Sequence, residues 1–180
     1  ASSDRMRRAI ANYKPKAQYP RNNRLDALRL SAGLMSGGLG TRVYYVHLGG
    51  FDTHNNQRGR HDQLMTQLGG AVAPFREDID KHGLGDRVVV AAFSEFGRRV
   101  QENGSGGTDH GVAGPMLLFG KSIKGGVYSK HPSLTDLDRG NLKMTTDFRR
   151  VDATMIAEWM GYGDTASIMK GEFPALGLFA

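Results

Sequence analysis

The sequence predicts an α/β protein with a parallel or mixed sheet flanked by helices. Strand-like apolar runs alternate with long helical patterns along the chain, which is typical of this class. The run at 87–93 is apolar almost throughout, as in a strand covered on both faces. A length of 180 residues suffices for one hydrophobic core, so we expect a single domain.

The N-terminal part is expected to be a surface arm followed by a helix. Residues 1–23 form the arm, in which Pro15 and Pro20 break any helix. The domain proper then covers residues 24–180. Apolar residues at helical spacing predict a helix over 24–36, which ends at the glycines that follow it.

The middle of the chain is expected to supply the first two strands and a long helix. The β-branched and aromatic run at 42–48 predicts a strand, and an amphipathic pattern predicts a helix over 61–82. A third strand is expected at 115–120, after a long glycine-rich loop. Further expectations are an edge strand at 124–129, an irregular stretch at 130–146, a helix over 148–160 capped by Asp147, and a short helix around 165–170.

Composition excludes several classes of protein. The chain has no cysteine, which excludes disulfides, cysteine-ligated zinc and a thiol nucleophile. No apolar run is long enough for a membrane-spanning helix. The formal net charge of +6 is compatible with anionic partners. We expect no nucleic-acid binding, because no recognisable motif or aromatic-basic stripe accompanies this charge.

Three polar clusters lie at the ends of the predicted strands. The first follows the strand at 42–48, the second follows the strand at 87–93, and the third precedes the strand at 115–120. Because α/β sheets place ligands at the carboxyl ends of their strands, we expect the clusters to serve one site. The candidate metal ligands are Asp52 and His54, Glu95, and Asp109 and His110.

The chemistry of these clusters favours a divalent metal. Asp52 and His54 are two residues apart in an extended loop, so both side chains project to the same side. Carboxylate oxygens combined with imidazole nitrogens suit zinc, manganese or iron. We expect zinc or manganese, as one or two ions. Nearby candidates for binding an anion are Arg58, Arg60 and Arg98, and His61 is a candidate second-layer partner of the ligands.

Each cluster also has a purely structural interpretation. Asp52 can cap a turn, and His54 can be an ordinary surface histidine. Glu95 can pair with Arg98 on the surface. The Asp109–His110 dipeptide can belong to a simple turn in its glycine-rich loop.

Three motifs, in order, resemble the bacterial domain-of-unknown-function family 1501, which is described as sulfatase-like. They are LGGFDTH at 48–54, FSEFGRRV at 93–100 and ENGSGGTDHG at 102–111. The stretches at 124–126, 131–134 and 145–149 are similar as well. The resemblance extends from about residue 10 to the C-terminus.

The resemblance places the chain with the alkaline phosphatase and sulfatase superfamily. It implies an alkaline-phosphatase-like α/β sheet with metal ligands at the strand ends. Asp52 and His54 would bind one metal, which His110 completes with Asp109 as a ligand or supporting partner. Glu95 would bind a second metal, and Phe96 follows it where a histidine is expected.

The resemblance also implies that residues 24–180 are the C-terminal part of a larger domain. The missing N-terminal part, which carries the nucleophile, or a second copy of the chain would be the partner. Members of the family often resemble twin-arginine exported proteins, so a periplasmic or exported location is expected.

Two functions follow from these observations. The first is part of a metal-dependent hydrolase that acts on small phosphate or sulfate esters, with the nucleophile outside this chain. The second is a non-catalytic metal-binding or assembly module that keeps the fold.

Overall fold

The computed structural model describes residues 2–21 and 25–180, which group into two compact units. Unit 1 contains the chain up to Val88 together with Gly104–Gly107. Unit 2 contains Val89–Asn103 and Thr108–Ala180. The boundary expected between residues 23 and 24 lies outside the described residues.

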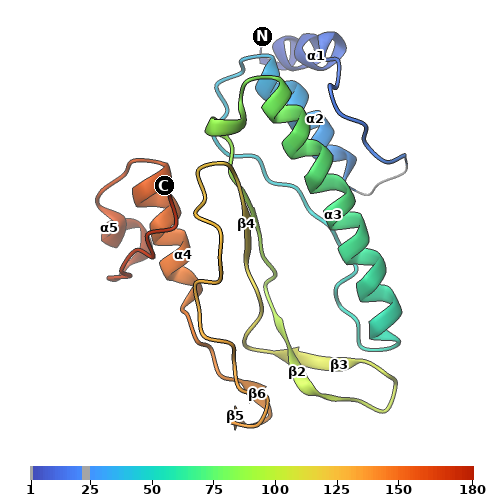
Figure 1. Ribbon diagram of the computed structural model, residues 1–180, viewed down its shortest axis with the longest axis vertical. Coiled ribbons are helices and arrows are strands. Elements are labelled where there is room, and N and C mark those ends of the chain that lie inside the picture. Colours follow the sequence, from blue (N-terminus) through green and yellow to red (C-terminus); the bar gives the residue numbers. More distant parts are fainter. Residues whose placement is uncertain (1, 22–24) are drawn as a thin grey trace. The chain divides into compact units, whose positions relative to one another are not determined.

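Unit 1 is helical, and its core lies between two helices. Its elements are α1 (Ser2–Asn12), α2 (Asp26–Ser36), α3 (Gln57–Lys81) and the 3₁₀ turn η1 (Gly85–Arg87). Helices α2 and α3 lie side by side (Figure 1). The apolar stripe predicted for the long helix is buried, with Phe75 and Ile79 at 1% and 0% exposure. Burying such side chains is the main source of stability for an amphipathic helix.

Helix α3 begins four residues earlier than the sequence predicts, at Gln57 rather than His61. Its first backbone N–H groups have distant partners, because a helix N-terminus leaves such donors unsatisfied. The N–H of Asn56 donates to Ser105 O at 3.1 Å, and the N–H of Gln57 donates to Gly106 O at 2.9 Å. The glycine-rich loop thus caps the helix. The local sequence around the helix start does not predict this cap.

Unit 2 contains three two-stranded antiparallel sheets followed by helices. The sheets pair β1 (Val90–Ala92) with β4 (Leu117–Phe119), β2 (Gly97–Glu102) with β3 (Thr108–Gly111), and β5 (Leu137–Asp138) with β6 (Asn141–Leu142). The helices are α4 (Phe148–Thr154), the π-helix η2 (Met155–Trp159) and α5 (Thr165–Met169).

The C-terminal helices follow the sequence prediction closely. Asp147 caps α4, since its Oδ1 accepts a hydrogen bond from the Arg149 N–H at 3.0 Å. Val151 is buried, as its position on the predicted inner face requires. Trp159 stacks on Phe179 with ring centroids 5.3 Å apart, which ties the end of the helix to the C-terminal tail.

The expected parallel or mixed sheet flanked by helices, and with it the alkaline-phosphatase-like fold, is wrong. Within the described residues every strand pair is antiparallel. The connection from β1 to β4 runs through the β2–β3 hairpin, which returns the chain in the opposite direction. Parallel pairing requires a crossover connection, usually a helix. The long helix α3 instead follows residues 42–48, which form no strand.

Residues 42–48 have strand-like composition but no strand partner among the residues that the structure describes. Val43 is 67% exposed and Tyr45 is 72% exposed. Strand propensity reflects the fit to a pleated, half-buried surface, so composition alone cannot supply the neighbour. The run at 87–93 forms only the three residues of β1, and its middle residue Ala91 is exposed.

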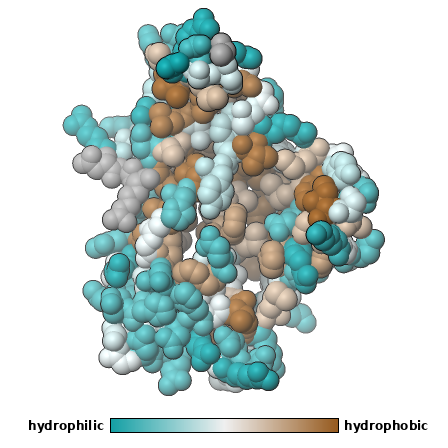
Figure 2. Space-filling model, turned by 180° about the vertical axis from the view of Figure 1, so that it is seen from behind, coloured by the Kyte–Doolittle hydropathy of each residue, from teal (hydrophilic) through white to brown (hydrophobic). Residues whose placement is uncertain are grey.

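Apolar side chains also reach the surface elsewhere. Val127 is 90% exposed and Val112 is 72% exposed. On the face drawn in Figure 2, apolar residues are interspersed with hydrophilic ones. No helix in the described part of the chain is long and apolar enough to cross a membrane.

Candidate metal centre

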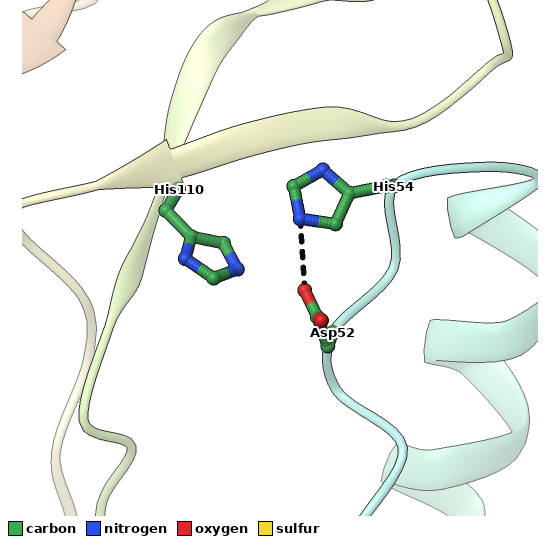
Figure 3. Close-up of side chains that lie close together, drawn as sticks. All are labelled: Asp52, His54 and His110. Atoms are coloured by element: carbon green, nitrogen blue, oxygen red, sulfur yellow. Dashed lines mark ion pairs between the residues drawn. The ribbon is translucent and has the colours of Figure 1, made fainter.

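The loop before α3 presents Asp52 and His54 on the same side of the backbone. Thr53 between them is fully buried, and its N–H donates to Phe51 O at 2.9 Å. This bond closes a tight turn at Asp52, and while Thr53 is buried its two neighbours are exposed. Their side chains meet, with His54 Nε2 and Asp52 Oδ1 2.9 Å apart (Figure 3).

The β2–β3 hairpin carries His110. In the register of this pair Arg98 lies opposite His110, and Gly97 lies opposite Gly111. Residues directly opposite in an antiparallel pair share one face, so the side chains of Arg98 and His110 are neighbours. The ring of Phe96 stacks on that of His110, with centroids 4.1 Å apart and planes inclined by 13°.

Close packing at Gly107 links the loop that precedes β3 to the loop that carries His54. A Cβ atom on Gly107 would lie 2.2 Å from the His54 carbonyl carbon and 2.6 Å from Asn55 N. Only glycine allows the two backbones to approach this closely.

Asp52, His54 and His110 form a group that can hold a metal ion. One ligand atom from each lies within 4.8 Å of the others, and all three side chains are exposed. Figure 3 shows them facing a common space. The ligands of a tetrahedral zinc ion lie about 3.3 Å apart, compared with separations of up to 4.8 Å in this group. Two imidazoles and one carboxylate fit zinc, and three protein ligands leave one position open.

The structure leaves the other two predicted ligands outside this group. Glu95 lies in the bend before β2 and is exposed. Asp109 precedes His110 on β3, and consecutive strand residues point to opposite faces. Metal binding by Glu95 and Asp109 therefore stays a prediction.

The predicted anion-binding residues are distributed over two elements. Arg58 and Arg60 lie in the first turn of α3, and Arg60 Nη1 donates to Asn55 Oδ1 at 3.4 Å. Arg98 lies on β2, where its Nη1 donates to Thr108 O at 2.6 Å. The ring of His61 makes an edge contact with Phe51, with centroids 5.8 Å apart, and this residue stays a predicted second-layer partner.

The sequence did not predict a buried polar cluster that is centred on Asp78. Asp78 is fully buried and accepts hydrogen bonds from the Tyr13 hydroxyl, from the Tyr19 hydroxyl at 2.8 Å and from the Lys16 N–H at 2.7 Å. Burial, reinforced by the hydrogen bonds to Asp78, raises the pKa of both tyrosines. The side chain of His82 is only 16% exposed, with its Nε2 3.4 Å from Asp78 Oδ1.

Comparison with known proteins identifies a family but no characterised relative. The model of the family described as "Protein of unknown function (DUF1501)" matches residues 3–168. No curated protein matches the sequence. No solved structure matches it either.

Proposed function

Since the chain belongs to the DUF1501 family, whose function is unknown, we propose that it is part of a metal-dependent hydrolase of phosphate or sulfate esters. The observation that carries this proposal is the exposed group of Asp52, His54 and His110. Two imidazoles, a carboxylate and an open position are typical of hydrolytic zinc sites.

The residues of the group have distinct parts in this proposal. Asp52, His54 and His110 hold a divalent ion, zinc or manganese. When bound, such an ion polarises an ester oxygen and lowers the pKa of bound water. Arg58 and Arg60 bind the negative charge of the small ester substrate, because guanidinium groups match phosphate and sulfate geometry.

The source of the nucleophile belongs to the same proposal. The three motifs offer no side chain that resembles the nucleophile of the alkaline phosphatase and sulfatase superfamily. We therefore propose that catalysis is completed by an N-terminal part of the parent protein or by a second copy of the chain. We also propose that the reaction is of the metal-dependent type found in that superfamily, and that the protein is periplasmic or exported.

The direct test is metal content measured by elemental mass spectrometry after purification without chelator. We expect about one transition metal per chain, as three ligands around one ion require. The single variants Asp52→Asn, His54→Ala and His110→Ala should each lose the metal. His131→Ala is the matched control, because this exposed histidine bonds only locally to Pro132 O at 2.8 Å.

Two further variants test the predicted ligands outside the group. Glu95→Gln and Asp109→Asn should reduce metal content only if these carboxylates bind a second ion. Metal-free wild-type protein, under conditions where zinc and manganese are supplied, would contradict the proposed function.

The alternative is a metal-binding module without catalysis. The exposure of all three ligands favours it, because hydrolytic sites usually exclude bulk water. Assays with p-nitrophenyl phosphate and p-nitrophenyl sulfate distinguish the two functions. Hydrolysis that requires both added metal and Asp52 supports the hydrolase. Stoichiometric metal binding without hydrolysis, measured with the N-terminal part or a second copy of the chain present, supports the non-catalytic metal-binding module.

A further inference from the structure

We propose that Phe96 is a positioning residue that holds the His110 ring in the orientation for metal binding. This inference rests on the proposed function, because it assigns His110 as a ligand. Phe96 occupies the position at which the family resemblance leads one to expect a histidine ligand. The structure gives this side chain a different task.

The strand register explains how Phe96 reaches His110. Arg98 is directly opposite His110, and Phe96 is two residues before Arg98. Side chains two residues apart along an extended strand lie on the same face, so all three project from one side of the hairpin. Phe96 is then the diagonal neighbour of His110, a separation that an aromatic ring can span.

The contact is a ring stack rather than a loose approach. The two ring centroids are 4.1 Å apart, and the planes are inclined by only 13°. Packing restricts the ring of an exposed histidine less than that of a buried one, and His110 is exposed. Stacking removes much of that freedom while leaving the ring nitrogens at the edge of the stack available to an ion.

Arg98 also contacts the ring of Phe96 and helps to hold it in place. Its guanidinium carbon lies 5.0 Å from the centroid of the Phe96 ring, within the range of cation–π attraction. Its Nη1 is fixed by the hydrogen bond to Thr108 O. The backbone of β3 therefore anchors Arg98, Arg98 contacts Phe96, and Phe96 orients the ligand on that same strand.

Indirect partners of this kind commonly change metal affinity by 10-fold to 100-fold when they are removed. Phe96→Leu keeps an apolar side chain but removes the ring, so the zinc dissociation constant should rise by about 10-fold or more. Phe96→Tyr keeps the ring and should restore affinity to near the wild-type value. Phe148→Leu is the control for loss of an exposed phenylalanine, at 57% exposure.

A second readout follows the ring itself without metal. In metal-free wild-type protein the carbon-bound imidazole protons of His110 should be shifted by the ring current of Phe96 in the NMR spectrum. The shift should disappear in Phe96→Leu and persist in Phe96→Tyr, with circular dichroism unchanged in both. His110→Ala assigns the resonances.

The outcomes separate this inference from the proposed function. Wild-type protein that shows the ring-current shift but takes up no zinc or manganese would refute the proposed function, and with it a positioning role in metal binding. Zinc uptake that needs His110 but is equally tight in Phe96→Leu would overturn the positioning role alone. An unshifted His110 in the wild type would show that the stack does not form.

Discussion

Unit 1 contains two Asp–His pairs that differ sharply in their surroundings. Asp78 and His82 lie near the end of α3 at 0% and 16% side-chain exposure, with 3.4 Å between carboxylate and imidazole. Asp52 and His54 lie in a loop at 62% and 45% exposure, with 2.9 Å between them. Residue type and pair distance are similar, so they do not decide the role of either pair.

The difference lies in what already occupies each carboxylate. The oxygens of Asp78 accept three hydrogen bonds from the segment between α1 and α2, given by Tyr13, Lys16 and Tyr19. This carboxylate fastens that segment to α3 and has no room for a ligand. Asp52 is exposed, pairs with His54 and belongs to the group that can hold an ion. A carboxylate that is buried and fully hydrogen-bonded, as Asp78 is, serves stability, whereas the exposed Asp52 can take part in binding.

The strongest way to sharpen this comparison is to remove each carboxylate. Asp78→Ala leaves two hydroxyls and a backbone N–H without their acceptor, and we expect the free energy of unfolding to fall by about 3 kcal/mol or more. Asp52→Ala in chelator should change it by less than about 0.5 kcal/mol, as for most exposed positions. Urea unfolding followed by circular dichroism measures both.

Metal binding should show the opposite order. Asp52→Ala should abolish zinc uptake, while any folded population of Asp78→Ala should retain it. Equal losses of stability in the two variants would contradict the distinction between a structural role for Asp78 and a metal-binding role for Asp52.

Some features of this fold could be predicted from local sequence patterns. The apolar spacing of α3 predicted a stripe of Leu64, Leu68, Val72, Phe75 and Ile79. All of these except the half-buried Leu68 are buried, because helical burial depends on local periodicity. The alternation around Thr53 likewise predicted that Asp52 and His54 would face the same way. Both predictions needed only the geometry of a few consecutive residues.

The failures concern partners that are distant in sequence. Residues 42–48 have the composition of a strand, but pairing depends on a neighbour that composition cannot specify. The stretch at 94–114 was expected to be a loop, yet Gly97 and Gly111 face each other in a hairpin. Asp78 gave no signal because its partners lie about 60 residues earlier in the chain.

The next effect in size concerns the contact that brings the glycine-rich loop to His54. Gly107→Ala places a methyl group within 2.3 Å of the carbonyl group of His54, so backbone must move. We expect a loss of about 1–3 kcal/mol in stability, typical of overpacking, together with weaker zinc binding. Gly104→Ala is the matched control in the same loop, since a Cβ there meets nothing within 4 Å.

Unfolding midpoints in urea and zinc titrations of the two alanine variants give the comparison directly. If Gly104→Ala weakens zinc binding as much as Gly107→Ala does, general loop stiffening rather than the close approach to His54 explains the effect.

The smallest expected effect concerns the two tyrosines that bond to Asp78. It is absent near neutral pH and appears as a loss of stability in alkali. Burial and the hydrogen bonds to Asp78 raise the pKa of Tyr13 and Tyr19 in the folded state above the value of about 10 for an unfolded chain. Their contribution is complete below pH of about 10 and is lost as the pH rises above it, because only the unfolded chain then readily releases these protons. One proton limits the slope to about 1.4 kcal/mol per pH unit for each tyrosine, and partial exposure to solvent reduces it further.

Absorbance of tyrosinate during a pH titration tests this expectation. Of the six tyrosines, two should ionise only together with unfolding, and Tyr13→Phe and Tyr19→Phe should each remove one from that late step. Tyr45→Phe is the control, since this residue is 72% exposed and lies outside the Asp78 cluster. A chain in which all six ionise together near pH of about 10 would mean that the Asp78 cluster is as open to solvent as the loop that carries Asp52.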